Sequence, residues 1–467
     1  MRRPNILLIN TDQQRWDALG ANGNREILTP NLDRLAAEGV NFGRFFVQNP
    51  VCMPSRVSFL TGQYCSTLRI LQNGVPVPED TVALPRLLRN YGYHSANLGK
   101  LHLLNHANRD HREVHPDYGF DHLEISDEPG CYEDAYRAWV RRIAPDQLDH
   151  LSVGLPPATA VWQKTMGVRD GIRHPAERNE RRPIVFPGRD DVTHTAFVAT
   201  RTIEYLKARA HDERPFLCVS GIYSPHSPWV APGRFMDLYD PDRLTLPAFP
   251  PEVDEKRGPG HYDDEELRGA RQGYYAMVSE VDHHVGRMLG ALEELGLADN
   301  TIVVFMSDHG EWLGEHLHYG KGYPAHDCIS RVPLIVRLPG GPSLGTIDPI
   351  VEAVDLVPTL LEACAIPVPG HLQGRSFLPL LEGGDRGNGR DSALTEGDGW
   401  KTLRTDDFRY VARADGSEFL YDLRQGLGEY HDVSGDPAYA GELSDHRRLL
   451  VQRMIELERP LPRTWPY

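Results

Sequence analysis

The sequence predicts an α/β fold in which helices cover both faces of one large, mostly parallel sheet, with a smaller α+β domain after it. Two observations support this prediction. Short runs of β-branched and leucine-rich residues are apolar throughout, as in strands buried on both faces of a sheet, and longer helical patterns lie between them. Of the 467 residues, 40% are hydrophobic and 25% are charged, which excludes a disordered chain and provides for a large core.

Five apolar runs are expected to be strands: Asn5–Ile9, His94–Leu98, Phe216–Ser220, Thr301–Met306 and Leu334–Leu338. The first run follows two arginines, as the apolar part of an export signal would. It ends at Asn10, however, whereas such a signal needs about 7–15 apolar residues. We therefore expect a first strand there. We expect no membrane span either, since a span needs roughly 20 consecutive apolar residues.

The first helix is expected between Thr29 and Gly39. Thr29 is a suitable N-cap, Pro30 occupies the first helical position, and a glycine follows the last turn. Three longer helical patterns cover Val192–Arg209, Glu265–Leu295 and Val354–Ala365. Residues 105–190 are less regular, and we expect loops and short helices there that shape the rim of a pocket.

The character of the chain changes after the glycine-rich stretch Glu382–Arg390. Thr402–Arg413 and Glu418–Leu423 are typical of a hairpin whose turn contains Asp415 and Gly416. A helical pattern over Glu442–Glu456 and a proline-rich tail follow. We therefore predict a large α/β catalytic domain over residues 1–380 and a small α+β domain with its tail over residues 381–467.

Charge and cysteine content exclude some classes of protein. The chain carries 50 basic and 66 acidic residues, a net charge of −16, which argues against nucleic-acid and anionic-membrane binding. Taken globally, the same balance argues against an anionic substrate. The six cysteines are scattered without CxxC spacing, which indicates reduced thiols and a cytoplasmic protein.

Acidic side chains follow two of the predicted strands. Asp12 and Gln13 come just after the first strand, and Asp308 and His309 come just after Thr301–Met306. Taken singly, Asp12 also fits a turn or cap, and Asp308-His309 also fits a structural hydrogen-bonded pair. Together at the carboxyl edge of a sheet, Asp12, Asp308 and His309 form a mainly oxygen ligand set, which suits calcium, magnesium or manganese better than zinc.

The segment Cys52-Met53-Pro54-Ser55-Arg56 predicts a short helix that begins near Pro54 and ends at Gly62. Cys52 would then lie at the helix N-terminus, where backbone N–H groups and the helix dipole favour anions, and Arg56 would lie one turn further on. Cys52 is therefore either a thiol of low pKa or an incidental buried cysteine.

These five residues match the C-x-P-S-R signature of the type I, formylglycine-dependent sulfatases of the alkaline phosphatase superfamily. The resemblance covers most of the chain and implies the fold of that superfamily. Other motifs resemble those of the family in the same order: Pro4–Gln13, Thr29–Ala36, Gly99–His102, Ser224–Pro228, Ser307–Gly310 with Lys321, and Leu420–Leu423 with Glu429.

The resemblance implies that a formylglycine-generating enzyme oxidises Cys52 to Cα-formylglycine, whose hydrated form attacks the sulfur or phosphorus of an ester. It also implies one divalent metal ion, with Ca²⁺ first and Mn²⁺ or Mg²⁺ as alternatives. The implied metal ligands are Asp12, Gln13, the modified Cys52, Asp308 and His309. The other implied catalytic residues are Arg56, Lys100, His102, His226 and Lys321. Alone, Lys100 or Lys321 also fits a solvated surface lysine, and His226 or His102 a loop histidine.

Three positions depart from the common sulfatase pattern. Gln13 stands where many sulfatases have a second aspartate, and His309 stands where many have asparagine. These two departures resemble the branch that contains choline sulfatases and phosphonate monoester hydrolases. Gln63 replaces the arginine that usually follows Leu60-Thr61-Gly62, which weakens the expected support of the modified residue.

Three functions remain open from the sequence. The first is hydrolysis of sulfate monoesters, arylsulfatase-like, and the second is hydrolysis of phosphonate monoesters or phosphodiesters by the same nucleophile. Lys100 and His102 favour the first, because the resembling phosphonate hydrolases carry uncharged hydroxyl residues there. The third is a catalytically inactive, metal-binding homologue, which would apply if Cys52 stays a thiol.

Arg56, Lys100 and Lys321 would make the pocket locally positive, so the acidic net charge does not exclude a small anionic sulfate ester as substrate. Aromatic residues of the rim and tail either stack on the substrate or simply pack: Trp139, Trp162, Trp465 and Tyr467. We expect no nucleic-acid or membrane partner, and a homo-oligomer in which the tail Pro460–Tyr467 reaches a neighbouring subunit.

Overall fold

The computed structural model describes residues 3–106, 111, 113–153, 171–175, 181–385, 387 and 389–458. Its main feature is an eight-stranded sheet in the order β10-β2-β9-β8-β1-β6-β3-β4. The strands are β1 (Asn5–Thr11), β2 (Val40–Phe46), β3 (His94–Gly99), β4 (His122–Ile125), β6 (Phe216–Gly221), β8 (Thr301–Ser307), β9 (Leu334–Arg337) and β10 (Gly345–Glu352). All neighbouring pairs are parallel except those of β9, which runs antiparallel to β2 and β8.

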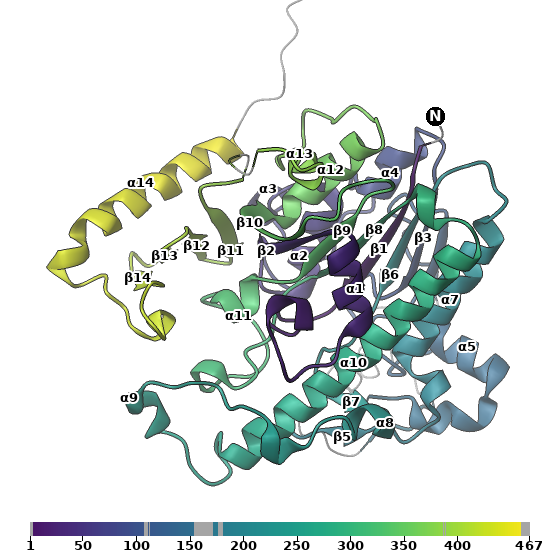
Figure 1. The fold of residues 1–467 in the computed structure, drawn as a ribbon, viewed down its shortest axis with the longest axis horizontal. Helices are drawn as coiled ribbons and strands as arrows, with labels where there is room; N and C mark the ends of the chain where they lie inside the picture. The colour runs from purple at the N-terminus through teal and green to yellow at the C-terminus, as the bar shows by residue number, and fades with distance from the viewer. Residues whose placement is uncertain are drawn as a thin grey trace, which may run out of the picture.

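Helices cover both faces of this sheet (Figure 1). One face carries α1 (Pro30–Glu38), α7 (His194–Arg209) and α10 (Asp264–Glu294), and the other carries α2 (Cys52–Thr61), α4 (Leu84–Arg89) and α12 (Leu356–Ala363). Alternate residues of β1 enter the two cores: Ile6 and Leu8 pack on the α2 side, and Leu7 and Ile9 on the α10 side. An entirely apolar strand is therefore buried on both faces, as its sequence predicts.

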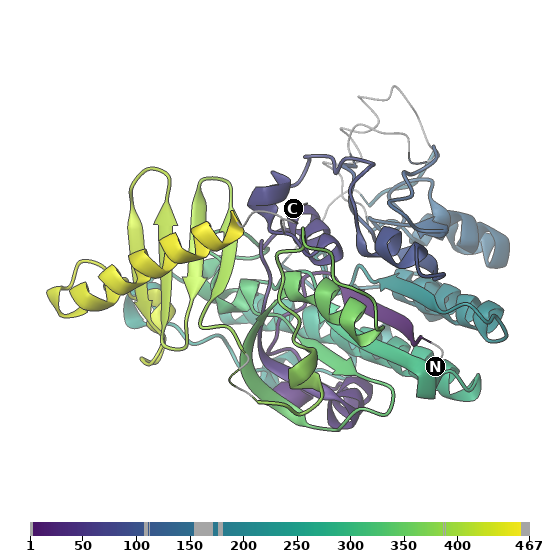
Figure 2. The same ribbon diagram turned by 90° about the horizontal axis from the view of Figure 1, so that it is seen from above.

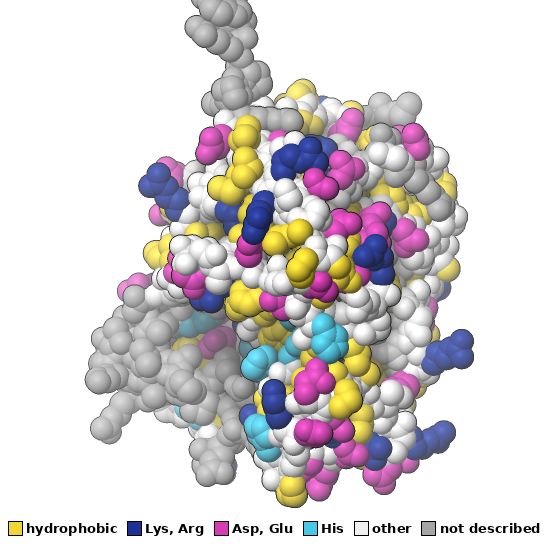
Figure 3. Space-filling view, turned by 90° about the vertical axis from the view of Figure 1, so that its left-hand side faces the viewer, with side chains coloured by type: hydrophobic (Ala, Val, Ile, Leu, Met, Phe, Trp, Pro, Cys, Tyr) yellow, Lys and Arg dark blue, Asp and Glu magenta, His cyan; other side chains and the backbone are white. Residues whose placement is uncertain are grey.

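A second, antiparallel sheet contains β11 (Ala393–Gly397), β12 (Trp400–Arg404), β13 (Phe408–Arg413) and β14 (Glu418–Asp422), in that order. Helix α14 (Ala440–Leu457) crosses this sheet, as Figure 2 shows from above. Its Leu443 and Leu450 pack into the core beneath it. Acidic, basic and apolar side chains are interspersed on the outward face of this part of the molecule (Figure 3).

The remaining elements are short and lie between these. They are α3 (Cys65–Leu68), α5 (Ala135–Ile143), β5 (Ile184–Val185), β7 (Val230–Ala231), α8 (Gly233–Met236), α9 (Pro251–Asp254), α11 (Asp327–Ser330) and α13 (Leu378–Leu381). Across the described ranges, we find no helix with the length and apolar character that crossing a bilayer requires.

All five predicted strands are present, and four of them extend one or two residues further than predicted. The last, Leu334–Leu338, ends at Arg337 and is antiparallel to its neighbours. Within the large sheet, the sequence prediction missed β2, β4 and β10. Polar or turn-forming residues interrupt two of these: Gly43 and Arg44 lie within β2, and Pro349 lies within β10.

The predicted helices are confirmed with small changes at their ends. Helix α7 begins at His194 because the Thr193 side chain caps it by accepting from the Ala196 N–H. The pattern Val354–Ala365 divides into a 3-10 turn, Ala353–Asp355, followed by α12.

The turn at Asp415-Gly416 is confirmed, but the single strand predicted over Thr402–Arg413 is wrong. A turn divides it into β12 and β13. Thr405 closes this turn: its N–H donates to the Phe408 carbonyl at 2.9 Å, and its hydroxyl accepts the Phe408 N–H at 3.2 Å. The domain boundary after residue 380 stays a prediction.

Trp139 is buried in the core, where its ring lies 5.5 Å from that of Phe197, so it packs and does not reach a substrate. Trp162, Trp465, Tyr467 and the tail Pro460–Tyr467 lie outside the described residues.

Candidate active site

Helix α2 places Cys52 at the carboxyl edge of the large sheet. The helix begins at Cys52 itself, slightly earlier than predicted, and ends at Gly62, whose φ of 67° lies in the left-handed region that glycine tolerates. Every residue of α2 is buried, and the Ser55 hydroxyl donates to the Asp308 carbonyl at 2.5 Å. The first turn of α2 is therefore fixed against the end of β8.

Four buried side chains meet at this edge: Asp12, Cys52, Asp308 and His309. Strands β1 and β8 pair with Thr11 opposite Ser307, so the two aspartates follow adjacent strand ends. One ligand atom from each of the four lies within 4.8 Å of the others, and Cys52 Sγ is 3.2 Å from His309 Nε2. Such a group could hold a metal ion.

The donor atoms fit a hard divalent cation. His309 Nδ1 lies 2.9 Å from the Gly310 carbonyl, an acceptor, so Nδ1 carries the proton and Nε2 keeps its lone pair towards the site. Gln13 donates its N–H to Asp308 Oδ1 at 3.0 Å and its side-chain amide to Glu311. This leaves Gln13 Oε1 buried and without a hydrogen-bond partner among the described residues. An orphaned amide oxygen beside two carboxylates is a suitable ligand for Ca²⁺ or Mg²⁺.

Two buried cations flank the carboxylates. Arg56 Nε donates to Asp308 Oδ2 at 2.8 Å, and Lys100 Nζ lies 2.6 Å from Asp12 Oδ2. Burial alone would raise the pKa of Asp12, but the neighbouring cations, Lys100 above all, hold it well below its ordinary value. Asp12 is therefore ionised and available as a ligand.

Lys321 and His226 lie on the other side of Cys52. Lys321 Nζ is 2.7 Å from Cys52 Sγ and 3.0 Å from His226 Nε2. Burial and the charge of Asp12 raise the pKa of the Cys52 thiol, but Lys321, Lys100 and His309 outweigh them and lower it. Burial and the neighbouring Lys321 lower the pKa of His226 well below its ordinary value, so its ring is neutral.

His102 is buried near this group, within electrostatic reach of Lys100, Arg56 and Asp12. The backbone N–H of His102 donates to Asp127 Oδ1 at 2.8 Å, and the backbone φ of His102 is 51°. The centroid of its ring lies 4.2 Å from that of the His106 ring. Burial, followed by the charges of His106 and Lys100, lowers the pKa of His102 well below its ordinary value. The structure therefore brings all the predicted site residues together.

The sequence analysis missed three residues that support the site. Glu311 binds the Gln13 amide, Tyr274 donates to the Gln13 carbonyl at 2.7 Å, and Asp127 holds His102. Glu311 follows His309 by two positions, which is a usable signal, whereas nothing local marks Tyr274 or Asp127. Gln63 follows the far end of α2, where it donates to the His371 carbonyl.

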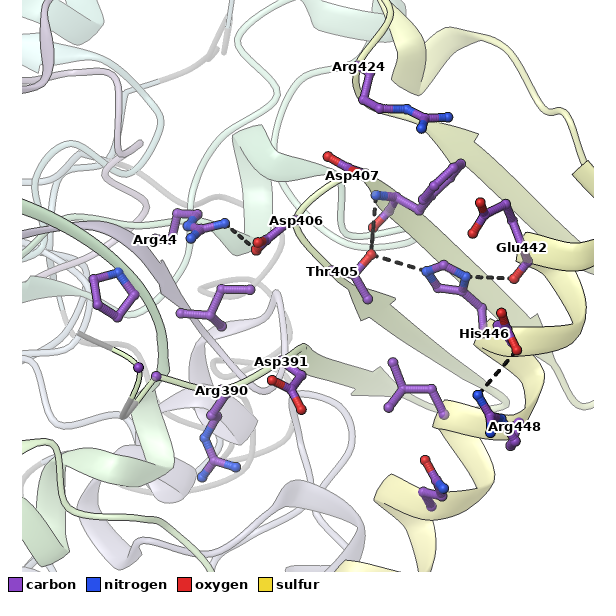
Figure 4. Close-up of a pocket in the computed structure, with 18 residues that line it drawn as sticks. Arg44, Arg390, Asp391, Thr405, Asp406, Asp407, Arg424, Glu442, His446 and Arg448 are labelled. Carbon is purple, nitrogen blue, oxygen red and sulfur yellow. Dashed lines mark hydrogen bonds and ion pairs between the residues drawn. The ribbon is translucent and has the colours of Figure 1, made fainter. Parts of the chain in front are cut away.

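A cavity of about 630 Å³ lies elsewhere, between β10, the second sheet and α14 (Figure 4). Its polar side chains are largely paired with each other or with nearby backbone: Arg44 with Asp406, His446 with Thr405, and Arg448 with Asp445. It contains none of the predicted site residues, so the candidate active site remains the group around Cys52.

Comparison with known proteins also indicates a sulfatase. The sulfatase family model matches residues 4–366, and the model of the N-sulphoglucosamine sulphohydrolase C-terminal region matches residues 314–458. The chain is 29% identical to an arylsulfatase of Clostridium perfringens, over 97% of this chain and 94% of the relative. It is also 29% identical to a multifunctional alkaline phosphatase superfamily protein of Trinickia caryophylli, over 99% and 97% respectively.

Among solved structures, the phosphonate monoester hydrolase of Agrobacterium radiobacter is similar, with a TM-score of 0.79 and 27% identity over 97% of this chain and 96% of that one. The large sheet, the buried group around Cys52 and the family match over residues 4–366 agree. The chain thus belongs to the sulfatase family of sulfuric ester hydrolases, within the alkaline phosphatase superfamily.

Proposed function

We propose that this protein hydrolyses sulfate monoesters and that Cys52, once converted to formylglycine, carries the nucleophile. One observation above all supports this: Cys52 lies at the N-terminus of α2, between the buried ligand group and the ammonium of Lys321. A nucleophile on this Cβ would lie beside the Lys321 ammonium and a cation held by the ligand group, both of which stabilise the charge that develops on an ester oxyanion.

The conversion is a two-electron oxidation at Cβ. A C=O bond replaces the C–S bond and one C–H bond, a formylglycine-generating enzyme supplies the oxidant, and the sulfur leaves as sulfide. Hydration of the aldehyde then gives a carbon with two hydroxyl groups.

Asp12, Asp308, His309, Gln13 and the modified Cys52 would hold one divalent cation, Ca²⁺ first, with Mn²⁺ or Mg²⁺ as alternatives. When bound, the cation lowers the pKa of the attacking hydroxyl and neutralises charge on the ester. Arg56 keeps the carboxylates oriented through its 2.8 Å contact with Asp308.

One hydroxyl of the hydrated residue attacks the sulfur, and the S–O bond to the alcohol or phenol breaks. His226, which lies 3.0 Å from the Lys321 ammonium, or His102 would stabilise the leaving oxygen or relay a proton to it, while Lys100 and Lys321 stabilise the charge on the sulfuryl oxygens. The second hydroxyl then loses its proton, the C–O bond to sulfate breaks, and the aldehyde returns.

A second candidate is hydrolysis of phosphonate monoesters or phosphodiesters by the same nucleophile. The likeness to a phosphonate monoester hydrolase and the presence of Gln13 and His309 favour it. The compact ammonium of Lys100 inside the site favours sulfate, which has no second ester arm to accommodate.

The comparison that decides between them is kcat/KM for an aryl sulfate, phenylphosphonate and a bis-aryl phosphate with one preparation. We expect the sulfate to be preferred, and a clear preference for either phosphorus ester would reject the first candidate. Mass spectrometry of the Cys52 peptide tests the third reading, an inactive homologue: only thiol, with no turnover of any ester, would support that reading.

We further propose a cytoplasmic location and a small anionic sulfate ester as substrate, the latter supported by the cations around Cys52. All six cysteines lie among the described residues and none of them forms a disulfide, which supports the location. A homo-oligomer stays a prediction, tested by light scattering before and after deletion of Pro460–Tyr467; an unchanged mass rejects assembly through the tail.

A further inference from the structure

Lys321 lies in a loop, yet its ammonium is placed 2.7 Å from Cys52 Sγ. The loop runs from Leu317 to the start of α11 at Asp327. Glycines on both sides of the lysine have positive φ angles, 86° at Gly320 and 120° at Gly322. Such a backbone has many accessible conformations, so contacts outside the loop must fix it.

The N-terminal anchor of the loop belongs to the large domain. Glu311 Oε1 accepts the N–H of Gly320 at 2.5 Å and that of Leu313 at 3.1 Å, while its second oxygen binds the Gln13 amide. The residue before Lys321 is thus tied to the ligand group.

The C-terminal anchor comes from the second sheet. Arg409, on β13, is completely buried, and its Nη1 donates to the Ala325 carbonyl at 2.5 Å. Its Nε donates to Glu429 at 2.6 Å, and the same carboxylate accepts the Asp327 N–H at 3.1 Å. Arg409 also pairs directly with Asp327. The guanidinium therefore contacts the loop both at its backbone and at its end.

A neighbouring strand adds a further contact: the Thr402 hydroxyl on β12 donates to the Pro324 carbonyl at 3.1 Å. Burial would raise the pKa of Glu429, but His326 and Arg409 hold it well below its ordinary value. A buried ionic network of this kind adds little net stability, because desolvation offsets its attraction. The network does, however, fix the relative positions of the groups that it joins, here residues 324–327 and Arg409.

We propose that Arg409 is a positioning residue that sets Lys321 against the residue at position 52, so that the second sheet completes the active site. The kinetic test of this proposal rests on the proposed function, because it measures the hydrolysis of a sulfate ester.

Arg453 provides a matched control. It is also a buried arginine of the C-terminal region, on α14, and it donates to Glu352 at 2.9 Å and to the Ser392 carbonyl at 2.6 Å. Arg453→Gln therefore breaks a comparable buried network that does not include residues 320–327.

The experiment is a double-mutant cycle with Lys321→Ala on formylglycine-bearing protein. We expect Arg409→Gln to lower kcat/KM for an aryl sulfate roughly 10–100-fold, mainly through kcat, because a small displacement of the lysine suffices. Adding Arg409→Gln to Lys321→Ala should cost little more, whereas the small effect of Arg453→Gln should multiply with that of Lys321→Ala. Full multiplication of the Arg409 and Lys321 effects, or an equal loss in Arg453→Gln, would overturn the proposal.

Hydrogen–deuterium exchange over residues 318–327 provides a readout without catalysis. We expect faster exchange there in Arg409→Gln than in the wild type and Arg453→Gln; equal rates in all three proteins would contradict the proposal. If the wild type hydrolyses no ester, the proposed function fails, and this measurement still decides the role of Arg409. Should Arg409→Gln not fold, Arg409→Lys keeps the charge but loses the planar fork, and takes its place in both measurements.

Discussion

Lys100 Nζ lies 2.6 Å from Asp12 Oδ2, and both side chains are almost completely withdrawn from solvent. The pair explains how a chain of net charge −16 can accept an anion. Lys100, Arg56 and Lys321 bring three positive charges to the site, against the carboxylates of Asp12 and Asp308. Once Glu311 and Asp127 beside the site are counted, these charges are close to balance, and a bound divalent cation would make the site positive.

The first prediction concerns the nucleophile. Cys52→Ala removes the group from which the nucleophile forms, so we expect kcat for any ester to fall by roughly 10³-fold or more. Cys218→Ala is the control, since Cys218 is equally buried but lies in the core of β6. The measurement is turnover of an aryl sulfate; retained activity in Cys52→Ala would exclude the proposed chemistry.

The second prediction concerns Gln13, whose buried Oε1 has no hydrogen-bond partner in the part of the chain that the structure describes. If this oxygen is a metal ligand, Gln13→Ala should weaken Ca²⁺ binding by roughly 10–100-fold. Calorimetric titration of the metal-free protein measures this, with the adjacent buried Gln14→Ala as control. An unchanged Kd in Gln13→Ala would leave Gln13 a purely structural residue.

Much of the fold could be predicted because its central strands are continuous apolar runs. β1 and β8 are buried on both faces, so their ends, and with them Asp12 and Asp308, could be located in advance. The order of the strands in the sheet could not be predicted, because β1 pairs with segments more than 200 residues away and such pairing leaves no local signal in the sequence. β10 was missed because Pro349, a residue that weakens strand patterns, lies in its middle.

The residues of the site also fall into a group that could be predicted from the sequence and a group that could not. The residues that approach Cys52 occur in short motifs, and the sequence predicts all of them. The residues that hold these side chains in place do not occur in such motifs. Tyr274 comes from the middle of α10, and Arg409 comes from a strand of the second sheet. Their contribution depends on tertiary contacts, so only the structure identifies them.

The third prediction concerns the dependence of stability on pH. Glu280 on α10 is buried, and burial raises its pKa from 4.5 to about 7 although the Thr193 hydroxyl donates to it. The folded state therefore binds this proton more tightly than the unfolded state does. The cost of ionising Glu280 is absent below about pH 4.5, grows as pH rises, and reaches about 3 kcal/mol above pH 7.

Glu280→Gln stays neutral throughout, so we expect it to reduce the loss of thermal stability between pH 5 and pH 8. Differential scanning fluorimetry at the two pH values measures the effect, and Glu294→Gln at the exposed end of the same helix is the control. The same loss of Tm in Glu280→Gln and wild type would show that Glu280 is not responsible.

The last prediction concerns the choice between sulfur and phosphorus esters. Lys100 lies beside Asp12 and over the ring of Tyr223, 4.9 Å from its centroid, so its ammonium is held in one place inside the site. Lys100→Thr removes this charge and introduces an uncharged hydroxyl. We expect kcat/KM for an aryl sulfate to fall roughly 10²–10³-fold, as for other groups that stabilise transition-state charge, and kcat/KM for phenylphosphonate to fall less.

The measurement is the ratio of the two kcat/KM values, because a general loss of folded enzyme would lower both equally. Lys207→Thr on the surface of α7 should leave the ratio unchanged. An unchanged ratio in Lys100→Thr as well would mean that Lys100 does not determine which ester the site prefers.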